Sequence, residues 1–304
     1  MRSKAVSDLA ELLSRFRNGD RLALSRLLSL VSRGRQLEEI RAGIGIPEHP
    51  GRVIALTGSG GVGKSTLVGR LTELAVERNN SMAVLACDPE SPLTGGALLG
   101  DRVRMTSSAE AEPPFIRSLA AASGHQAIAE HLDLMIPLLQ AYGFETILLE
   151  TVGAGQGDIA IRHLVDVLVL LLQPESGDDL QWEKAGLLEV ADVIVVHKAD
   201  LPGADNVVAQ VSGEVNLAGA PEVPVLKVSA AKREGLDELW TTIQSLPSQK
   251  HKFRSGAVQL LQLAVERLSD RFHHSSEKFA DVLAKWHEGE LSDTEAADEV
   301  LRRL

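Results

Sequence analysis

Cysteine, aromatic side chains and long apolar runs are all scarce in this sequence of 304 residues. The single cysteine, Cys87, excludes an intrachain disulfide and a cluster of cysteine ligands, and is typical of a reducing compartment. Aromatic residues make up only 3%, so a core must rest on aliphatic side chains. The longest apolar stretch, Val165 to Leu172, is far below the roughly 18 residues of a membrane-spanning helix. Met1 to Ala10 has no apolar region of the kind found in signal peptides. We therefore expect a cytoplasmic protein.

Basic residues are outnumbered, with 31 Lys and Arg against 42 Asp and Glu and a formal net charge of −11. An acidic chain repels phosphate backbones and anionic lipid surfaces, which predicts neither nucleic acid nor membrane as a partner. Nucleotides stay possible because they need only a local anion site. Apolar residues at 44% and charged residues at 24% are typical of a globular chain with a sizeable core.

Hydrophobic periodicity divides the chain into three parts. Apolar residues recur at helical spacing from about Val6 to Arg41, which predicts a helical hairpin or small bundle. Short β-branched runs then alternate with helices, a pattern typical of a parallel sheet covered on both faces. After about Arg254 only helices are predicted. The expected boundaries are an N-terminal helical extension at 1–46, an α/β domain at 47–250 and a C-terminal helical arm at 251–304.

Six strands and seven further helices are predicted beyond the N-terminal extension. The strands are Val53–Thr57, Ala83–Ala86, Thr146–Glu150, Val167–Leu172, Val193–His197 and Val225–Ser229. The helices lie near Lys64–Arg78, Gln126–Tyr142, Leu180–Val190, Leu236–Ser245, Val258–Leu268, Lys278–Trp286 and Thr294–Leu304, and a capping box at Ser292–Glu295 begins the last of them.

A glycine-rich segment stands between the first of these strands and an amphipathic helix. It fits G-x-x-x-x-G-K-S in the context that this phosphate loop requires. Its glycines permit backbone angles closed to other residues, so successive N–H groups can converge on phosphates, and the helix N-terminus adds partial positive charge. Lys64 is expected to reach the β- and γ-phosphates and Ser65 to bind Mg²⁺. The predicted nucleotide-binding residues here are Gly58, Ser59, Gly60, Gly61, Val62, Gly63, Lys64, Ser65 and Thr66.

Two segments further on predict guanine as the base. His197-Lys198-Ala-Asp200 resembles the N-K-x-D motif, in which a carboxylate accepts both N1–H and N2–H₂ of guanine, a pairing unavailable from adenine. The Lys198 stem is expected across the base, and a ring N–H of His197 could donate to N7. Ser229-Ala230-Ala231 resembles the loop whose backbone N–H contacts O6. An ordinary loop after a strand is the alternative interpretation of Lys-Ala-Asp.

Acidic residues after the strands are candidate Mg²⁺ ligands, since ligands of open α/β sheets bind beyond the carboxyl ends of the strands. Asp88 follows a strand and Glu150 ends one, and a turn-capping role is the alternative for each. Asp101 lies in a loop and is a metal ligand or a solvated acid.

A glycine and a glutamine after Glu150 are candidates for the hydrolysis step. Gly153 is spaced as in a D-x-x-G switch, where a backbone N–H meets the γ-phosphate. Gln156 either orients the attacking water or makes a hydrogen bond within its loop. The candidate catalytic residues are thus Lys64, Glu150 and Gln156. No arginine is clearly poised to assist, so slow intrinsic hydrolysis is expected.

Three segments together resemble the MeaB/ArgK family, GTPases that chaperone cobalamin-dependent acyl-CoA mutases. They begin at Val84 (V-L-A-C-D-P-E-S), Thr94 (T-G-G-A-L-L-G-D-R-V-R-M) and Glu150 (E-T-V-G-A-G-Q). The resemblance implies a P-loop α/β fold with a mostly parallel sheet flanked by helices and helical extensions at both ends. It also implies GTP, GDP and Mg²⁺ as ligands, a homodimer formed through the C-terminal arm, and a cobalamin-dependent mutase as partner. Asp178 and Lys184 are implied as switch residues coupled to that partner.

Two other functions stay open. A metal-insertion GTPase of the nickel-delivering type requires a Cys/His ligand set, and here Cys87 is alone while only His273 and His274 are adjacent among nine histidines. A small-molecule kinase requires an acceptor pocket beside the γ-phosphate, and no independent signature of one is found.

Overall fold

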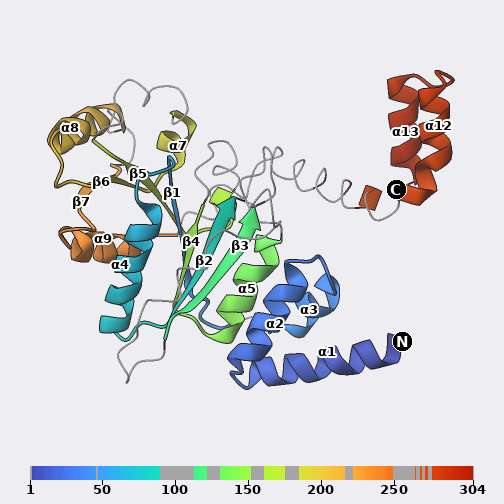
Figure 1. The fold of residues 1–304 in the computed structure, drawn as a ribbon, viewed down its shortest axis with the longest axis horizontal. Coiled ribbons are helices and arrows are strands. Elements are labelled where there is room, and N and C mark those ends of the chain that lie inside the picture. Colours follow the sequence, from blue (N-terminus) through green and yellow to red (C-terminus); the bar gives the residue numbers. More distant parts are fainter. Residues whose placement is uncertain are drawn as a thin grey trace. The chain divides into compact units, whose positions relative to one another are not determined.

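The computed structural model (Figure 1) describes the chain over the following residues. They are 2–45, 47–89, 113–121, 131–151, 161–174, 185–215, 222–248, 264, 268, 271–272 and 276–303. The chain divides into two compact units, residues 1–250 and residues 251–304.

A parallel sheet forms the centre of the first unit. Its seven described strands lie in the order β3-β2-β4-β1-β5-β6-β7, and every pairing between them is parallel. They are β1 (Arg52–Gly58), β2 (Met82–Pro89), β3 (Phe115–Ala121), β4 (Thr146–Glu150), β5 (Val167–Leu172), β6 (Val193–His197) and β7 (Val225–Val228). Their carboxyl ends share one edge of the sheet, where open α/β folds bind ligands.

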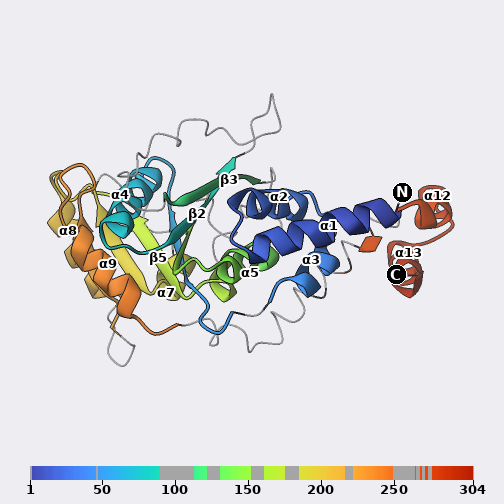
Figure 2. The same ribbon diagram turned by 90° about the horizontal axis from the view of Figure 1, so that it is seen from below.

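Alternate residues of each strand face opposite layers of helices. In β1, Val53 and Ala55 pack into one apolar cluster, whereas Ile54 and Leu56 pack into another. Helix α5 and the N-terminal helices cover the first face near β1, and α4 and α9 cover the second (Figures 1 and 2). The described helices of this unit are α1 (Arg2–Arg17), α2 (Arg21–Val31), α3 (Leu37–Gly43), α4 (Lys64–Glu77), α5 (Leu132–Tyr142), the 3₁₀ turn η2 (Ile161–His163), α7 (Ala185–Val190), α8 (Ala204–Val215) and α9 (Leu236–Ser245).

The N-terminal helices pack on the sheet. Leu24, Leu27 and Leu28 of α2 are fully buried in the same cluster as the first face of β1. Arg117 of β3 also reaches α2, where its guanidinium donates to the Ser25 carbonyl oxygen at 3.2 Å and to the Ser29 hydroxyl at 3.1 Å. The helices and the sheet therefore share one core.

The fold predicted from the sequence is confirmed, although one strand, one α-helix and the short turn η2 were missed. Strand β3 was missed because Arg117, Ser118 and small alanines interrupt its apolar pattern; the strand owes its place to its parallel pairing with β2 and to the contact of Arg117 with α2. Helix α8 was missed because valines and Gly213 lower its helix propensity. It forms because Val207 and Val211 pack against β5 and β6.

The start of α5 was also misplaced. This helix begins at Leu132, after His131 in a left-handed conformation, rather than near Gln126. Most of the helix predicted at Val258–Leu268 and the first residues of the one predicted at Leu180–Val190 lie outside the described residues.

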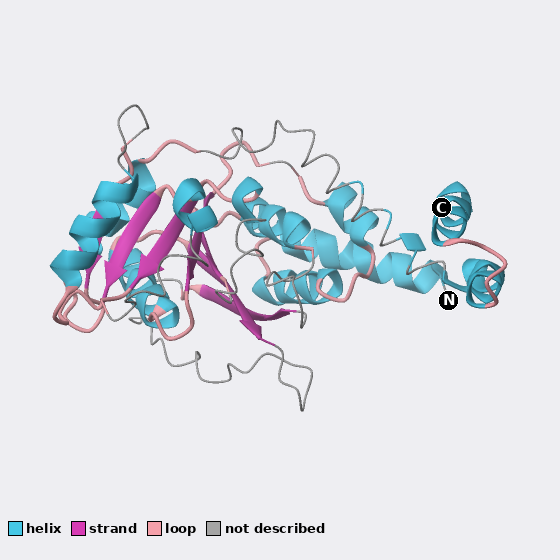
Figure 3. Cartoon of the chain, turned by 90° about the horizontal axis from the view of Figure 1, so that it is seen from above, coloured by secondary structure: helices cyan, strands magenta, loops and turns pink. Residues whose placement is uncertain are grey.

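In the second unit the structure describes a pair of helices, α12 (Ala280–His287) and α13 (Asp293–Arg303), after the 3₁₀ turn η4 (Ser276–Phe279) (Figure 3). The predicted capping box is confirmed, since the Ser292 backbone N–H donates to the Glu295 carboxylate at 3.0 Å and the Glu295 N–H returns to the Ser292 hydroxyl at 3.4 Å. Among the described residues no helix is both long and apolar enough to cross a membrane.

Candidate functional site

The glycine-rich loop connects β1 directly to α4. Gly63 precedes the first helical residue with φ +100°, a left-handed conformation that favours glycine. A Cβ at Gly63 would lie 2.6 Å from the imidazole of His197, so glycine is required here for space as well as for conformation. The loop therefore runs closely against the end of β6. The first backbone N–H groups of α4 point into this loop.

Three polar side chains of the predicted site meet beside this loop. Lys64 is 8% exposed, and its ammonium donates to the carbonyl oxygens of Gly58 and Ser59 at 2.6 and 3.1 Å. The Ser65 hydroxyl donates to the Glu150 carboxylate at 2.6 Å. Glu150 ends β4, between β1 and β2, and is 4% exposed. A charged amine, a hydroxyl and a buried carboxylate thus lie at the N-terminus of one helix.

The second predicted group lies at the carboxyl end of β6. Lys198 donates to the Gly61 carbonyl oxygen at 3.0 Å and to the side chain of Gln173 at 2.8 Å. The Asp200 carboxylate accepts from the Ser229 hydroxyl at 2.5 Å, and this hydrogen bond holds the pKa of Asp200 below its usual range. Asp200 is therefore an ionised acceptor at neutral pH.

His197 turns toward the phosphate loop. Its side chain is 3% exposed, and its Nδ1 lies 2.8 Å from the carbonyl oxygen of Val62. Burial lowers the pKa of His197, outweighing the opposing effect of the hydrogen bond to Val62. The imidazole is therefore neutral at pH 7.

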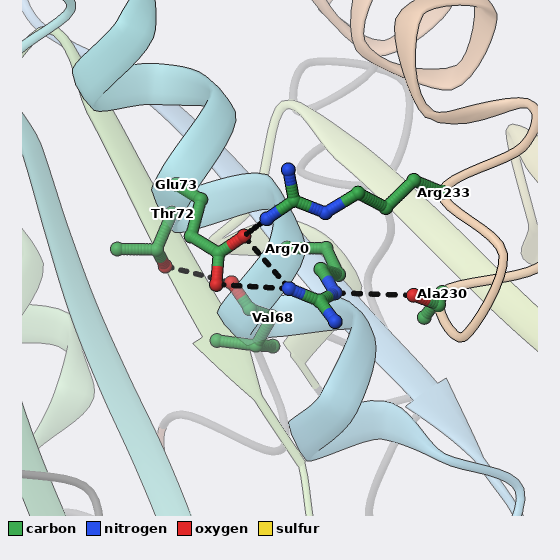
Figure 4. Close-up of polar contacts among 6 residues, drawn as sticks. All are labelled: Val68, Arg70, Thr72, Glu73, Ala230 and Arg233. Atoms are coloured by element: carbon green, nitrogen blue, oxygen red, sulfur yellow. Dashed lines mark hydrogen bonds and ion pairs between the residues drawn. The ribbon is translucent and has the colours of Figure 1, made fainter. Parts of the chain in front are cut away.

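Helix α4 also holds the loop that follows β7. Arg70 donates from Nε to the Ala230 carbonyl oxygen at 3.1 Å and from Nη1 to the Glu73 carboxylate at 2.9 Å. Figure 4 shows Arg233, from the far side of the same loop, reaching Glu73 as well. The segment that carries the phosphate loop is thus tied to the segment predicted to contact guanine O6.

The structure brings together most of the residues predicted from sequence. The loop 58–66, Glu150, His197–Asp200 and Ser229–Ala231 all lie at the carboxyl edge of the sheet or in the loops that follow it. The backbone of Asp88 lies at the same edge, at the end of β2 beside β4. The remaining predicted positions, Asp101, Gly153, Gln156, Asp178 and Lys184, lie outside the described residues.

Sequence reasoning missed two residues of this region. Gln173 could have been found, because it directly follows the buried strand β5 and so stands at the ligand-binding edge. Arg70 carries no such signal, because it lies inside a helix and its partner Ala230 is 160 residues away in sequence.

A glycine-rich loop between a parallel strand and a helix, with Lys64 and Ser65 at the helix start, defines a P-loop nucleoside triphosphatase. Residues 32–274 match the family described as "Methylmalonyl Co-A mutase-associated GTPase MeaB". The chain belongs to this family of GTP-hydrolysing enzymes, which confirms the resemblance found in its sequence.

Individual relatives agree with this assignment. A putative GTPase of Pyrococcus abyssi is 38% identical over 241 residues, which are 77% of this chain and 74% of that protein. The GTPase ArgK of Escherichia coli is 37% identical over 249 residues, or 77% of this chain and 75% of that one. A crystal structure of an LAO/AO transport system kinase has a TM-score of 0.64 over 97% of both chains, and at 23% identity this likeness shows a common fold alone.

Proposed function

We propose that this GTPase is a chaperone for a cobalamin-dependent acyl-CoA mutase of the methylmalonyl-CoA mutase type. Its nucleotide state gates the loading of cobalamin and protects the loaded mutase. The observation that carries the proposal is the match of residues 32–274 to a family described as mutase-associated. In this proposal 1–46 is a helical extension, 47–250 the GTPase domain and 251–304 a dimerisation arm.

The phosphate loop binds the triphosphate. Backbone N–H groups of residues 58–66 surround the phosphates, and Lys64 exchanges its carbonyl acceptors for the β- and γ-phosphate oxygens. This exchange is favourable because a hydrogen bond between two charged groups is stronger than one to a neutral carbonyl. The buried position of Lys64 directs its ammonium to the loop rather than to solvent.

The Ser65–Glu150 pair fits Mg²⁺. A hydroxyl and a buried carboxylate 2.6 Å apart supply the hard oxygen atoms that Mg²⁺ takes, one or two from protein with the rest from phosphates and water. Ser65 and Glu150 hold the ion, with Asp88 and Asp101 as further oxygen donors. Bound Mg²⁺ supplies neutralisation of the charge on the phosphates.

Guanine is recognised between β6 and the loop after β7. The ionised Asp200 accepts from N1–H and N2–H₂ of the base, and its hydrogen bond from Ser229 orients it for both. Lys198, held at both Gly61 and Gln173, lays its stem across the base. The backbone of Ala230 and Ala231 donates to O6.

Hydrolysis is slow in the isolated protein and is coupled to the partner. Gly153 senses the γ-phosphate and Gln156 orients the attacking water, while Asp178 and Lys184 reorganise with the nucleotide and face the mutase. Completing such a site typically adds about 10³–10⁵ in rate, so a partner-supplied group has ample room to act.

A homodimer is formed through the C-terminal arm. Among the described residues of that unit, Leu283, Trp286 and Leu301 are 38%, 42% and 54% exposed. Helix α13 buries none of its residues within the chain. Large apolar side chains left in water favour association.

The test is complex formation between the full chain and the purified cobalamin-dependent mutase of its host, with GDP and with a non-hydrolysable GTP analogue. We expect binding whose strength differs between the two nucleotides, and cobalamin transfer to the apo-mutase that follows the same difference. Lys64→Ala is the matched variant, and it should abolish the nucleotide dependence. A mutase that binds with neither nucleotide contradicts the chaperone function.

The same preparation separates the two other functions. Phosphate release from GTP in the absence of any acceptor counts against a kinase, whereas stoichiometric labelling of a small molecule supports one. Tight stoichiometric binding of Ni²⁺ by the purified protein supports metal insertion and counts against the function as a mutase chaperone.

A further inference from the structure

The contact between His197 and the phosphate loop decides which ring nitrogen carries hydrogen. A carbonyl oxygen can only accept, so the Nδ1 that lies 2.8 Å from the Val62 oxygen must be the protonated one. A neutral imidazole has a single N–H. His197 therefore uses its only ring N–H for the hydrogen bond to Val62, and its Nε2 carries a lone pair.

The surroundings of the ring keep it in this form. Nε2 is buried and has no hydrogen-bond partner among the described residues. The charged groups that act on the ring are Lys198, which lowers the pKa of His197, and Asp200, which raises it, and both are weaker than burial. The ring cannot turn freely, because its Nδ1–Cε1 edge lies against Gly63.

On its Hoogsteen edge, the edge that faces the major groove in DNA, guanine presents two acceptors, N7 and O6. A donor is needed for each. The O6 donor is the backbone of the loop after β7, and the Lys198 ammonium is engaged with Gly61 and Gln173. A neutral His197 with its N–H on Val62 offers N7 no donor at all.

We propose that His197 is a specificity-determining residue. It holds the end of β6 against the phosphate loop and makes no hydrogen bond to guanine N7. The base is then selected through N1–H, N2–H₂ and O6 alone, and purines altered at position 7 are accepted. This inference rests on the proposed guanine site and deepens it. An asparagine in the same place has two amide hydrogens, enough for Val62 and N7 together.

The test compares dissociation constants of the full chain for GDP, 7-deaza-GDP and IDP at pH 8, where His197 is neutral. 7-Deaza-GDP lacks the N7 acceptor, and IDP lacks the 2-amino group. We expect the wild type to bind GDP and 7-deaza-GDP within about twofold and to bind IDP at least about tenfold more weakly, because a charge-assisted contact to Asp200 is lost. His197→Asn should bind GDP about fivefold more tightly than 7-deaza-GDP, the usual effect of one hydrogen bond.

His197→Ala is the matched control for a purely structural role. It removes the hydrogen bond to Val62, so it should weaken the binding of GDP and of 7-deaza-GDP equally. The ratio of the two dissociation constants should stay near one. A wild type that binds 7-deaza-GDP fivefold more weakly than GDP overturns the inference, and so does a His197→Asn variant with no preference. If His197→Asn fails to fold, the wild-type ratio alone decides. Failure to bind GDP at all contradicts the proposed guanine site rather than the role of His197.

Discussion

At the scale of single residues, Gly63 and His197 pack closely against each other in the site. Gly63 stands at φ +100°, and the imidazole occupies the space where any larger residue would carry its Cβ. Gly61, two residues earlier, also has a positive φ of +75° but has nothing within 4 Å of a Cβ position. The two glycines thus separate the conformational requirement from the steric one.

Replacing Gly63 by alanine should lower the free energy of unfolding by about 2–4 kcal/mol. About 1–2 kcal/mol comes from the left-handed backbone, and the remainder from forcing a methyl group against the ring. Gly61→Ala is the control, and it should lower the free energy of unfolding by only about 1–2 kcal/mol, the part that comes from the left-handed backbone. Denaturant unfolding without nucleotide measures both.

A double variant isolates the contact. Gly63→Ala combined with His197→Ala should be less destabilised than the sum of the single changes, because removing the ring makes room for the methyl group. Strict additivity would show that the contact of Gly63 with His197 carries no energy.

At the scale of elements, α4 links the two halves of the proposed nucleotide site. Its first residues complete the phosphate loop, and one turn later Arg70 holds the Ala230 carbonyl oxygen in the loop after β7 (Figure 4). Arg78, one residue past its end, reaches Asp237 of α9 and lies over the ring of Trp240. A displacement of α4 would therefore shift the loop after β7, which is proposed to contact guanine O6.

Arg70→Ala should weaken GDP binding about fivefold, since one hydrogen bond that orients the guanine loop is lost at about 1 kcal/mol. The loss should fall on recognition of O6, so the variant should discriminate less than wild type against 6-thio-GDP, which keeps N1–H and the 2-amino group but replaces that oxygen by a weakly accepting sulfur. Competition binding measures both nucleotides.

Arg233→Ala is the matched control, because it removes a second guanidinium from Glu73 without touching the Ala230 carbonyl oxygen. It should leave the affinity and the discrimination close to wild type. Equal effects of the two substitutions would refute a positioning role for Arg70.

At the scale of the whole molecule, the chain consists of a nucleotide-binding unit and a separate helical unit. The first has a sheet whose central strands are buried, and so it folds around its own core. Among the residues described in the second, Phe279 and Val282 are buried, whereas Leu283, Trp286 and Leu301 are exposed.

Association of two chains should cover these exposed apolar side chains. We expect a mass of twice 32.6 kDa by light scattering. The double variant Leu283→Glu and Leu301→Glu should shift it toward one chain, because charges would replace exposed apolar side chains. Ala284→Glu with Ala297→Glu adds the same charge at exposed positions of the same helices and should stay dimeric. A wild type with the mass of one chain at every concentration contradicts the homodimer.

Much of the fold could be predicted from sequence because its signals are local. β4, β5 and β6 carry unbroken apolar runs, and the glycines before Lys64 specify a strand, a turn and a helix within fifteen residues or so. Strand β3 and helix α8 escaped prediction because distant partners, rather than local preference, hold them in place.

The sequence by itself determined that this chain binds a nucleoside triphosphate and belongs among the mutase-associated GTPases, since both conclusions rest on residue types at short spacing. Only the tertiary structure decided how those residues are used. Ser65 meets Glu150 across 85 residues, and His197 meets Val62 across 135, because parallel strands deliver distant segments to one edge of the sheet. The ring nitrogen of His197 that carries hydrogen is set by its contact with Val62. The proposal that guanine N7 receives no hydrogen bond depends on this contact, which cannot be inferred from the order of residues.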